Sequence, residues 1–186
     1  MKYKTEKGYT IIETMIATAL FLIVIMTGMG ALLNANLLHQ KSQDMRSIMD
    51  NLSFIMDDMS KNLRTGYNYH CIEDGNLTTT NSHSCASGTG VSFRSAFSSQ
   101  WVYAISAGTI QKSVDGGTTF TTLTPPEVII NPLPGFSVLG AESEASVVGD
   151  RQQPFVTIKL VGTITFKNVI TPFSLQTSAS QRLTDI

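Results

Sequence analysis

A single carboxylate, Glu13, lies near the start of a long apolar stretch that continues to Leu38. The chain has no charged residue from Thr14 to Leu38, and the next charge is Lys41. An acid at the edge of a membrane-spanning helix is costly unless it has a partner, and such residues are functional by default. Glu13 is therefore the first candidate for chemistry, through pairing with a cation.

A second group of reactive side chains lies well after this stretch. Cys71 and Cys85 are the only cysteines, and in an oxidising compartment such a pair predicts a disulfide. It would close a loop of about 15 residues and stabilise the fold by roughly 3 kcal/mol. The alternative is a zinc site that also uses His70 and His83. Adjacent His70 and Cys71 are awkward as two tetrahedral ligands and the usual Cys-x2-Cys spacing is absent, so we predict the disulfide and no metal.

The remaining titratable groups do not form a catalytic set. Glu142 and Glu144 fit a solvated surface, and no histidine has a nucleophile at a suggestive spacing. The histidines are His39, His70 and His83. A glycine-rich phosphate loop is absent from the sequence. We predict that the chain is not an enzyme and needs no cofactor.

The apolar stretch is long enough to cross a membrane. Its 25 residues from Thr14 to Leu38 would form roughly 37 Å of helix, against a hydrocarbon core of about 30 Å. The basic residues before it outnumber the single acid, Glu6, so the positive-inside rule places the N-terminus in the cytoplasm. These basic residues are Lys2, Lys4 and Lys7. The predicted location is the cytoplasmic membrane, with one span and the C-terminal part outside.

Three interpretations of this segment are open. A cleaved secretory signal peptide has an apolar core of about 7–15 residues, which is shorter than this stretch, and Glu13 would disrupt it. A permanent single-span anchor explains the length but leaves Glu13 unexplained, and it would make the chain a membrane-tethered extracellular binding or adhesion module. The third interpretation accounts for both features and depends on the residues around Glu13.

The segment Lys7-Gly8-Tyr9-Thr10-Ile11-Ile12-Glu13 resembles the type IV prepilin signature, a basic leader that ends in Gly, then an aromatic residue, then Glu at the fifth mature position. Tyr9 replaces the usual Phe and Ile11-Ile12 replaces a commoner Leu-Ile pair, but both changes keep the apolar character. The resemblance implies that a prepilin peptidase cuts after Gly8 and methylates the new amino group of Tyr9. It also implies that Glu13 pairs with the amine of a neighbouring subunit, which sets the register because an unpaired buried charge is costly.

The same resemblance implies a structural subunit of a filament, either a type IV pilus or a type II secretion pseudopilus, at the cell surface or in the periplasm. The implied partners are the prepilin peptidase, other pilin or pseudopilin subunits, an inner-membrane assembly platform, and membrane lipid before assembly. The region from Asn51 to Gly66 is similar to J-type minor pseudopilins and W-type minor pilins, which favours a minor subunit. The formal net charge of −1 argues against nucleic acid as a main partner, so DNA would be met only indirectly, through a DNA-uptake filament.

A second helical segment follows the apolar one. Apolar residues recur there at three- and four-residue steps, as in an amphipathic helix that packs on a core. They are Met45, Ile48, Met49, Leu52, Ile55, Met56, Met59 and Leu63. Asp57 and Lys61 have the spacing of a favourable surface pair, and Gly66 fits the position after a helix end. One helix is therefore expected to run from the leader to about Thr65.

The rest of the chain predicts a β-rich head domain. Strands are expected at 90–93, 101–105, 109–113, 118–123, 128–130, 154–166 and 173–178. Asp115-Gly116-Gly117 has the turn chemistry of a hairpin, and residues 113–120 resemble a single Asp-box, which in one copy marks a rigid hairpin. The expected fold class is α+β and pilin-like, with a long N-terminal helix packed on a C-terminal antiparallel sheet. The expected parts are a leader at 1–8, a membrane or filament-core helix at 9–38, an amphipathic helix at 39–66 and a head domain at 67–186.

Overall fold

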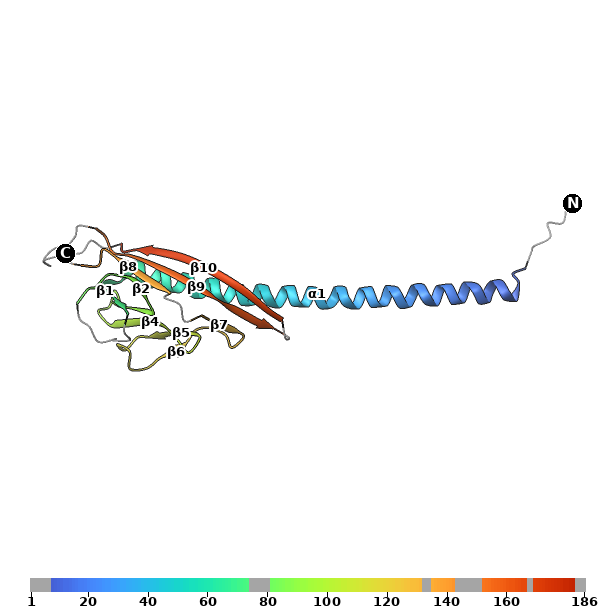
Figure 1. Cartoon of the computed structure of the whole chain (residues 1–186), viewed down its shortest axis with the longest axis horizontal. Helices are drawn as coiled ribbons and strands as arrows, with labels where there is room; N and C mark the ends of the chain where they lie inside the picture. Colours follow the sequence, from blue (N-terminus) through green and yellow to red (C-terminus); the bar gives the residue numbers. More distant parts are fainter. Residues whose placement is uncertain (1–7, 74–80, 132–134, 143–151, 167–168, 183–186) are drawn as a thin grey trace. The chain divides into compact units, whose positions relative to one another are not determined.

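The chain folds as one long helix followed by antiparallel strands, which confirms the predicted α+β class (Figure 1). The computed structural model describes residues 8–73, 81–131, 135–142, 152–166 and 169–182. The helix, α1, spans Ile11–Thr65 and so ends at the predicted residue. The predicted leader before Gly8, together with Glu144, lies outside the described residues. The chain divides into two compact units, Met1–Arg46 and Ser47–Ile186.

In the first unit, α1 presents an apolar surface with no cover from the protein. Every residue from Gly8 to Gln40 is exposed, and large side chains such as Leu20 and Phe21 are about 60% exposed. The helix is long and apolar enough to cross a membrane, as the sequence predicts. Such a surface needs lipid or other helices around it.

In the second unit, one face of α1 is buried. Six of the eight residues of the predicted apolar stripe belong to the core: Ile48, Leu52, Ile55, Met56, Met59 and Leu63. Gly66 follows the helix, and a Cβ there would lie 2.4 Å from the ring of Phe93 in strand β3 (Gly90–Arg94). This glycine is therefore required by close packing, while its φ angle is not in the left-handed region.

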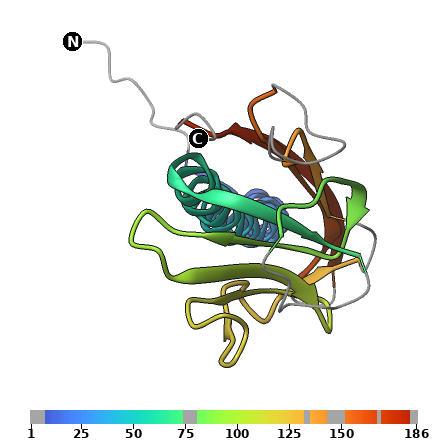
Figure 2. The ribbon, with the colours of Figure 1, turned by 90° about the vertical axis from the view of Figure 1, so that its left-hand side faces the viewer.

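The strands form two antiparallel sheets. The first has the order β1-β3-β4-β5-β6 and comprises Tyr67–Ile72, Gly90–Arg94, Gln100–Ser106, Thr109–Ser113 and Thr121–Thr122. The second has the order β10-β9-β8-β2, with β7 also paired to β9, and comprises Val169–Ser180, Phe155–Phe166, Phe136–Leu139, Cys85–Gly88 and Val128–Ile130. In Figure 2 the green and yellow strands of the first sheet run below α1, and the red and orange strands of the second lie beside it.

The longest strands, β9 and β10, pair over their full length in an unbroken register. β9 alternates as predicted, with its even-numbered residues from 156 to 164 buried. β10 is longer than the expected 173–178. The strand starts at Val169 and continues through Pro172, which lies opposite Thr163. Proline interrupts central strands but is tolerated at the edge of a sheet, and β10 is an edge strand.

Three strands have no clear signal in the sequence: β1, β2 and β8. β1 alternates Tyr67, Tyr69 and Cys71 with polar residues over only five positions. Asn68 within it has a φ of 56°, and its pairing with β3 shifts register between Tyr67 and His70. β2 is four residues long and is also irregularly paired. Conversely, the strand expected at 118–123 is paired only at Thr121–Thr122, because the residues before it belong to a turn.

Aromatic rings fill the core between helix and first sheet. Phe93 packs against three rings with centroids 5.9 to 6.2 Å away, those of Tyr69, Trp101 and Tyr103. The Tyr69 hydroxyl donates to the carbonyls of Leu63 and Gly66. Carbonyls at a helix end lack helical partners, so this buried tyrosine satisfies groups that the end of α1 leaves open.

Candidate functional site

The predicted processing site precedes α1 and is open. Tyr9 is 84% exposed, and a Cβ at Gly8 would meet no atom within 4 Å. Within the described residues, no side chain packs on Gly8 or Tyr9, so a protease can reach the backbone between them. Cleavage after Gly8 and methylation of Tyr9 stay predictions from the resemblance.

Thr10 caps the N-terminus of α1. Its Oγ1 accepts a hydrogen bond from the Glu13 N–H at 3.4 Å, and its carbonyl accepts one from the Thr14 N–H at 3.2 Å. A threonine cap with glutamate three residues later is the capping-box pattern. The spacing of Thr10 and Glu13 is the sequence signal for this cap, which was not among the predictions above. The observed bond uses the backbone N–H of Glu13, so it does not occupy the carboxylate.

The side chain of Glu13 is available to a partner from another chain. It is exposed, and in the described part of the chain no cationic group lies within 4 Å of its carboxylate. It lies in the first turn of α1, where the positive end of the helix dipole favours a carboxylate. A carboxylate in this place can accept charge-assisted hydrogen bonds from an ammonium group that a second chain brings.

The predicted disulfide is present between Cys71 at the end of β1 and Cys85 at the start of β2. Their Cα atoms are 5.7 Å apart, and both residues are buried. Because both sulfur atoms are used in this bond, neither is a free thiolate for the alternative zinc site. The bond joins a strand of the first sheet to a strand of the second, so it links the two sheets of the head.

The two histidines of that alternative do lie together. The rings of His70 and His83 are 5.5 Å apart, and Nδ1 of His70 is 3.1 Å from the carbonyl of Asn81. Burial lowers the pKa of His70, the hydrogen bond with Asn81 raises it, and the charge of His83 lowers it, with a net decrease. The imidazole of His70 is therefore mostly neutral at pH 7. Among the described residues, no group of three or more side chains of the metal-ligating kind includes these two histidines.

Glu142 is not the freely solvated carboxylate that we expected. Its two oxygens accept hydrogen bonds from the backbone N–H of Ser84 at 2.9 Å and from the Ser84 hydroxyl at 2.6 Å. Burial raises the pKa of Glu142, but the two bonds from Ser84, a hydrogen bond from the backbone of Glu142 itself and the charge of His83 together lower it by more, so the net pKa lies below its usual value. The carboxylate holds the segment next to Cys85.

The expected hairpin turn at Asp115 is confirmed. Its carboxylate accepts hydrogen bonds from the hydroxyl of Ser113, the N–H of Thr118 and both polar groups of Thr119. These bonds, led by the one from Ser113, hold the pKa of Asp115 well below its usual range. Gly116 and Gly117 have φ angles of 77° and 92°, which suit glycine. The turn uses the carboxylate fully and leaves it no catalytic role.

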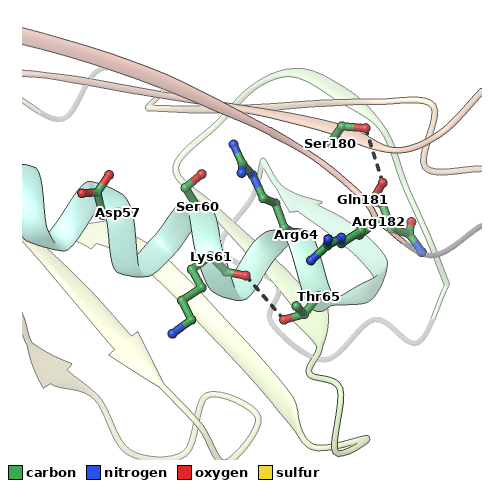
Figure 3. A pocket seen from close by; sticks show the side chains of 8 residues that line it. All are labelled: Asp57, Ser60, Lys61, Arg64, Thr65, Ser180, Gln181 and Arg182. Atoms are coloured by element: carbon green, nitrogen blue, oxygen red, sulfur yellow. Dashed lines mark hydrogen bonds between the residues drawn. The ribbon is translucent and has the colours of Figure 1, made fainter.

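The predicted ion pair of Asp57 with Lys61 is replaced by another. Among the described residues, the ion pair that forms is between Asp58 and Lys112 of β5. Asp57 and Lys61 instead line a cavity of about 810 Å³ at the end of α1 (Figure 3). The other lining residues are Ser60, Arg64, Thr65, Ser180, Gln181 and Arg182.

Two basic side chains from distant parts of the sequence line this cavity. The N–H of Arg182, after β10, donates to the carbonyl of Arg64, in the last turn of α1, at 2.9 Å. Figure 3 shows both guanidinium groups on the side of the helix that faces β10, while Lys61 extends to the other side. Neither guanidinium has a carboxylate within 4 Å in the described part of the chain. A pair of this kind suits an incoming carboxylate.

Comparison with known proteins adds no identification to this geometry. No protein-family model, curated protein or solved structure matches the chain. The features that bear on function are therefore the start of α1 and the surfaces of the head domain.

Proposed function

We propose that this chain is a structural subunit, a minor pilin or pseudopilin, of a type IV pilus-like or type II secretion filament. The observation that carries the proposal is the start of α1, an exposed apolar helix that begins at Ile11 with Glu13 in its first turn. A prepilin peptidase would cut after Gly8, and the inner-membrane platform would add the subunit to its neighbours. The helix would leave the membrane for the filament core, with the head outside.

The chemistry of assembly follows from two charges in an apolar setting. Cleavage gives Tyr9 a positive amine one residue before the cap, Thr10, and Glu13 supplies the negative group. Between stacked helices, an unpaired charge of either sign is strongly disfavoured, so only an offset that pairs them is stable. The apolar helix then supplies most of the affinity, and the ion pair selects the register.

The first test is mass spectrometry of the mature protein from its native membrane. The proposal expects an N-terminus at Tyr9 that carries one methyl group. An intact Met1 would contradict it and would favour a membrane-tethered binding module with an uncleaved anchor. A cut near Ala35, within the later part of the apolar stretch, would contradict it as well and would favour a cleaved signal peptide and a secreted head.

The second test separates the effect of the Glu13 charge from the effect of the helix cap at Thr10. Glu13→Gln removes the charge but keeps a side chain that fits a capping box, whereas Thr10→Ala removes the cap but keeps the charge. We expect Glu13→Gln to reduce incorporation into filaments strongly, with membrane insertion unchanged. Thr10→Ala should cost the helix about 1 kcal/mol and leave incorporation largely intact. The opposite pattern would mean that Glu13 serves the helix end alone.

A further inference from the structure

One edge of strand β10 has no partner strand among the described residues. β10 pairs only with β9, and it is the last strand in its sheet. The odd-numbered residues of β9 bond to the β7 and β8 side, as the N–H groups of Lys159 and Thr165 show. The backbone groups of the even-numbered residues of β9 therefore bond to β10, where their partners are odd-numbered residues. Because backbone groups alternate in direction along a strand, the N–H and C=O groups of the even-numbered residues of β10 point away from β9, toward the free edge. Pro172, which has no N–H, is one of these outward residues and fits this assignment.

Beyond Pro172, the outward N–H groups of β10 are those of four exposed residues: Ser174, Gln176, Ser178 and Ser180. None of the four has a backbone partner on this side among the described residues. The row ends at Arg182, whose N–H is bonded to Arg64 of α1. The backbone groups from Ser174 to Ser180 can therefore bond to an added strand, whereas at Arg182 the bond to α1 occupies the edge.

This edge lacks the features that normally prevent pairing. Edge strands are usually short, irregular or charged. The other edges follow this rule, since β6 and β7 have two and three residues and β1 and β2 have register shifts. β10 has twelve residues, an unbroken register and no charged side chain, and proline blocks it only at Pro172. On its inner face, Phe173 and Leu175 remain partly exposed, as if the sheet were one strand short.

Charge restricts what can add to this edge. Beyond Ser180 the edge meets the guanidinium groups of Arg64 and Arg182, which favour a carboxylate. A second copy that paired antiparallel through its own β10 would bring no carboxylate to this place, because β10 has no charged side chain.

We propose that the free edge of β10 binds an extended segment of another subunit of the same filament, which adds as a sixth strand to the second sheet. The segment is uncharged where it faces Ser174 to Ser180, and it carries a carboxylate that meets Arg64 and Arg182. Backbone hydrogen bonds supply affinity, and the carboxylate fixes how far the segment slides along the edge. This inference rests on the proposed function for the identity of the partner.

The test is chemical cross-linking of the full chain in its native membrane. Ser178→Cys supplies the only free thiol, since Cys71 and Cys85 are bonded, and it is labelled with a cysteine-reactive benzophenone. Illumination should give an adduct with another protein that begins with an apolar helix of the prepilin type, identified by mass spectrometry. Phe97→Cys, 91% exposed at the turn before β4, is the control site and should not give this adduct.

A proline at the edge makes the test specific for strand addition. Gln176→Pro removes an N–H that points to the free edge and leaves every hydrogen bond with β9 in place. The fold should therefore persist, while the yield of the adduct falls about tenfold. Gln176→Ala keeps the N–H and should leave the yield unchanged. Arg64→Gln with Arg182→Gln should reduce the yield several-fold.

Four results would overturn the inference: no adduct, an adduct that Gln176→Pro does not reduce, one with a second copy of this chain, or one with a protein of another type. The N-terminus is measured in the same sample. A methylated Tyr9 without an adduct would overturn strand addition alone, whereas an intact Met1 would overturn the proposed function whatever the adduct shows.

Discussion

Lys112 of β5 and Asp58 of α1 form an ion pair across the head domain, with 3.1 Å between Nζ and Oδ2. The same ammonium lies 4.5 Å from the centroid of the Trp101 ring. Asp58 also accepts a hydrogen bond from the hydroxyl of Tyr103 at 3.2 Å. One carboxylate on the helix therefore holds two side chains of the first sheet, and this contact fixes the helix on that sheet.

Lys112→Met should destabilise the head domain by about 1.5 kcal/mol. The variant loses the ion pair and the contact of the cation with Trp101, and it leaves Asp58 with fewer partners. Urea unfolding of the full chain in detergent, followed by far-UV circular dichroism, measures the change. Lys61→Met, at an exposed position, is the control and should change stability by less than about 0.5 kcal/mol. Equal losses in both variants would contradict a special role for Lys112.

The stability of the head should fall at alkaline pH through Tyr103. Burial raises the pKa of its hydroxyl, the bond from Asn62 lowers it, and the charge of Asp58 and the bond to it raise it, with a net increase above 10.0. The unfolded chain therefore loses this proton first, and stability is full below about pH 10 and decreases above it. Tyr103→Phe should flatten this decrease. Unfolding free energies at pH 8 and pH 10.5 test it, and an unchanged slope in the variant would exclude Tyr103 as the cause.

Removal of the disulfide should cost roughly 3 kcal/mol. Cys71→Ser with Cys85→Ser frees the loop between β1 and β2 in the unfolded chain and unlinks the two sheets. Dithiothreitol should lower the melting temperature of the original chain to that of the double variant. The reductant should leave the double variant itself unchanged, and any further loss there would indicate another target.

Glu142 should contribute stability that disappears in acid. Its pKa is lowered in the folded chain by the hydrogen bonds from Ser84, so the contribution is present above the unfolded value of 4.5 and decreases as the pH falls below it. Glu142→Gln should be less stable at pH 7 and should lose less stability between pH 6 and pH 3. Glu127, whose side chain has no hydrogen bond among the described residues, provides the control variant Glu127→Gln. A steeper acid loss in Glu142→Gln would contradict the assignment.

Local pattern was sufficient for the elements with strong periodicity. The apolar run after Glu13, the stripe that includes Leu52 and Met59, and the alternation of β9 each bury or expose one continuous surface, so their period is visible in the chain. The turn at Asp115 was equally clear, because its hydrogen bonds join residues within five positions. The disulfide followed from there being only two cysteines.

Features made by residues far apart in the sequence required the folded chain. β1, β2 and β8 have weak patterns, and they form because a neighbouring strand accepts their backbone bonds. Sequence spacing suggested Asp57 with Lys61, yet folding brought Asp58 to Lys112, 54 positions away, because the register of β5 and the helix rotation place those two groups together. The open edge of β10 and the Arg64–Arg182 pair are of the same kind. Edges and distant pairs depend on which strand lies next to which, and strand order is a property of three-dimensional packing that no local period encodes.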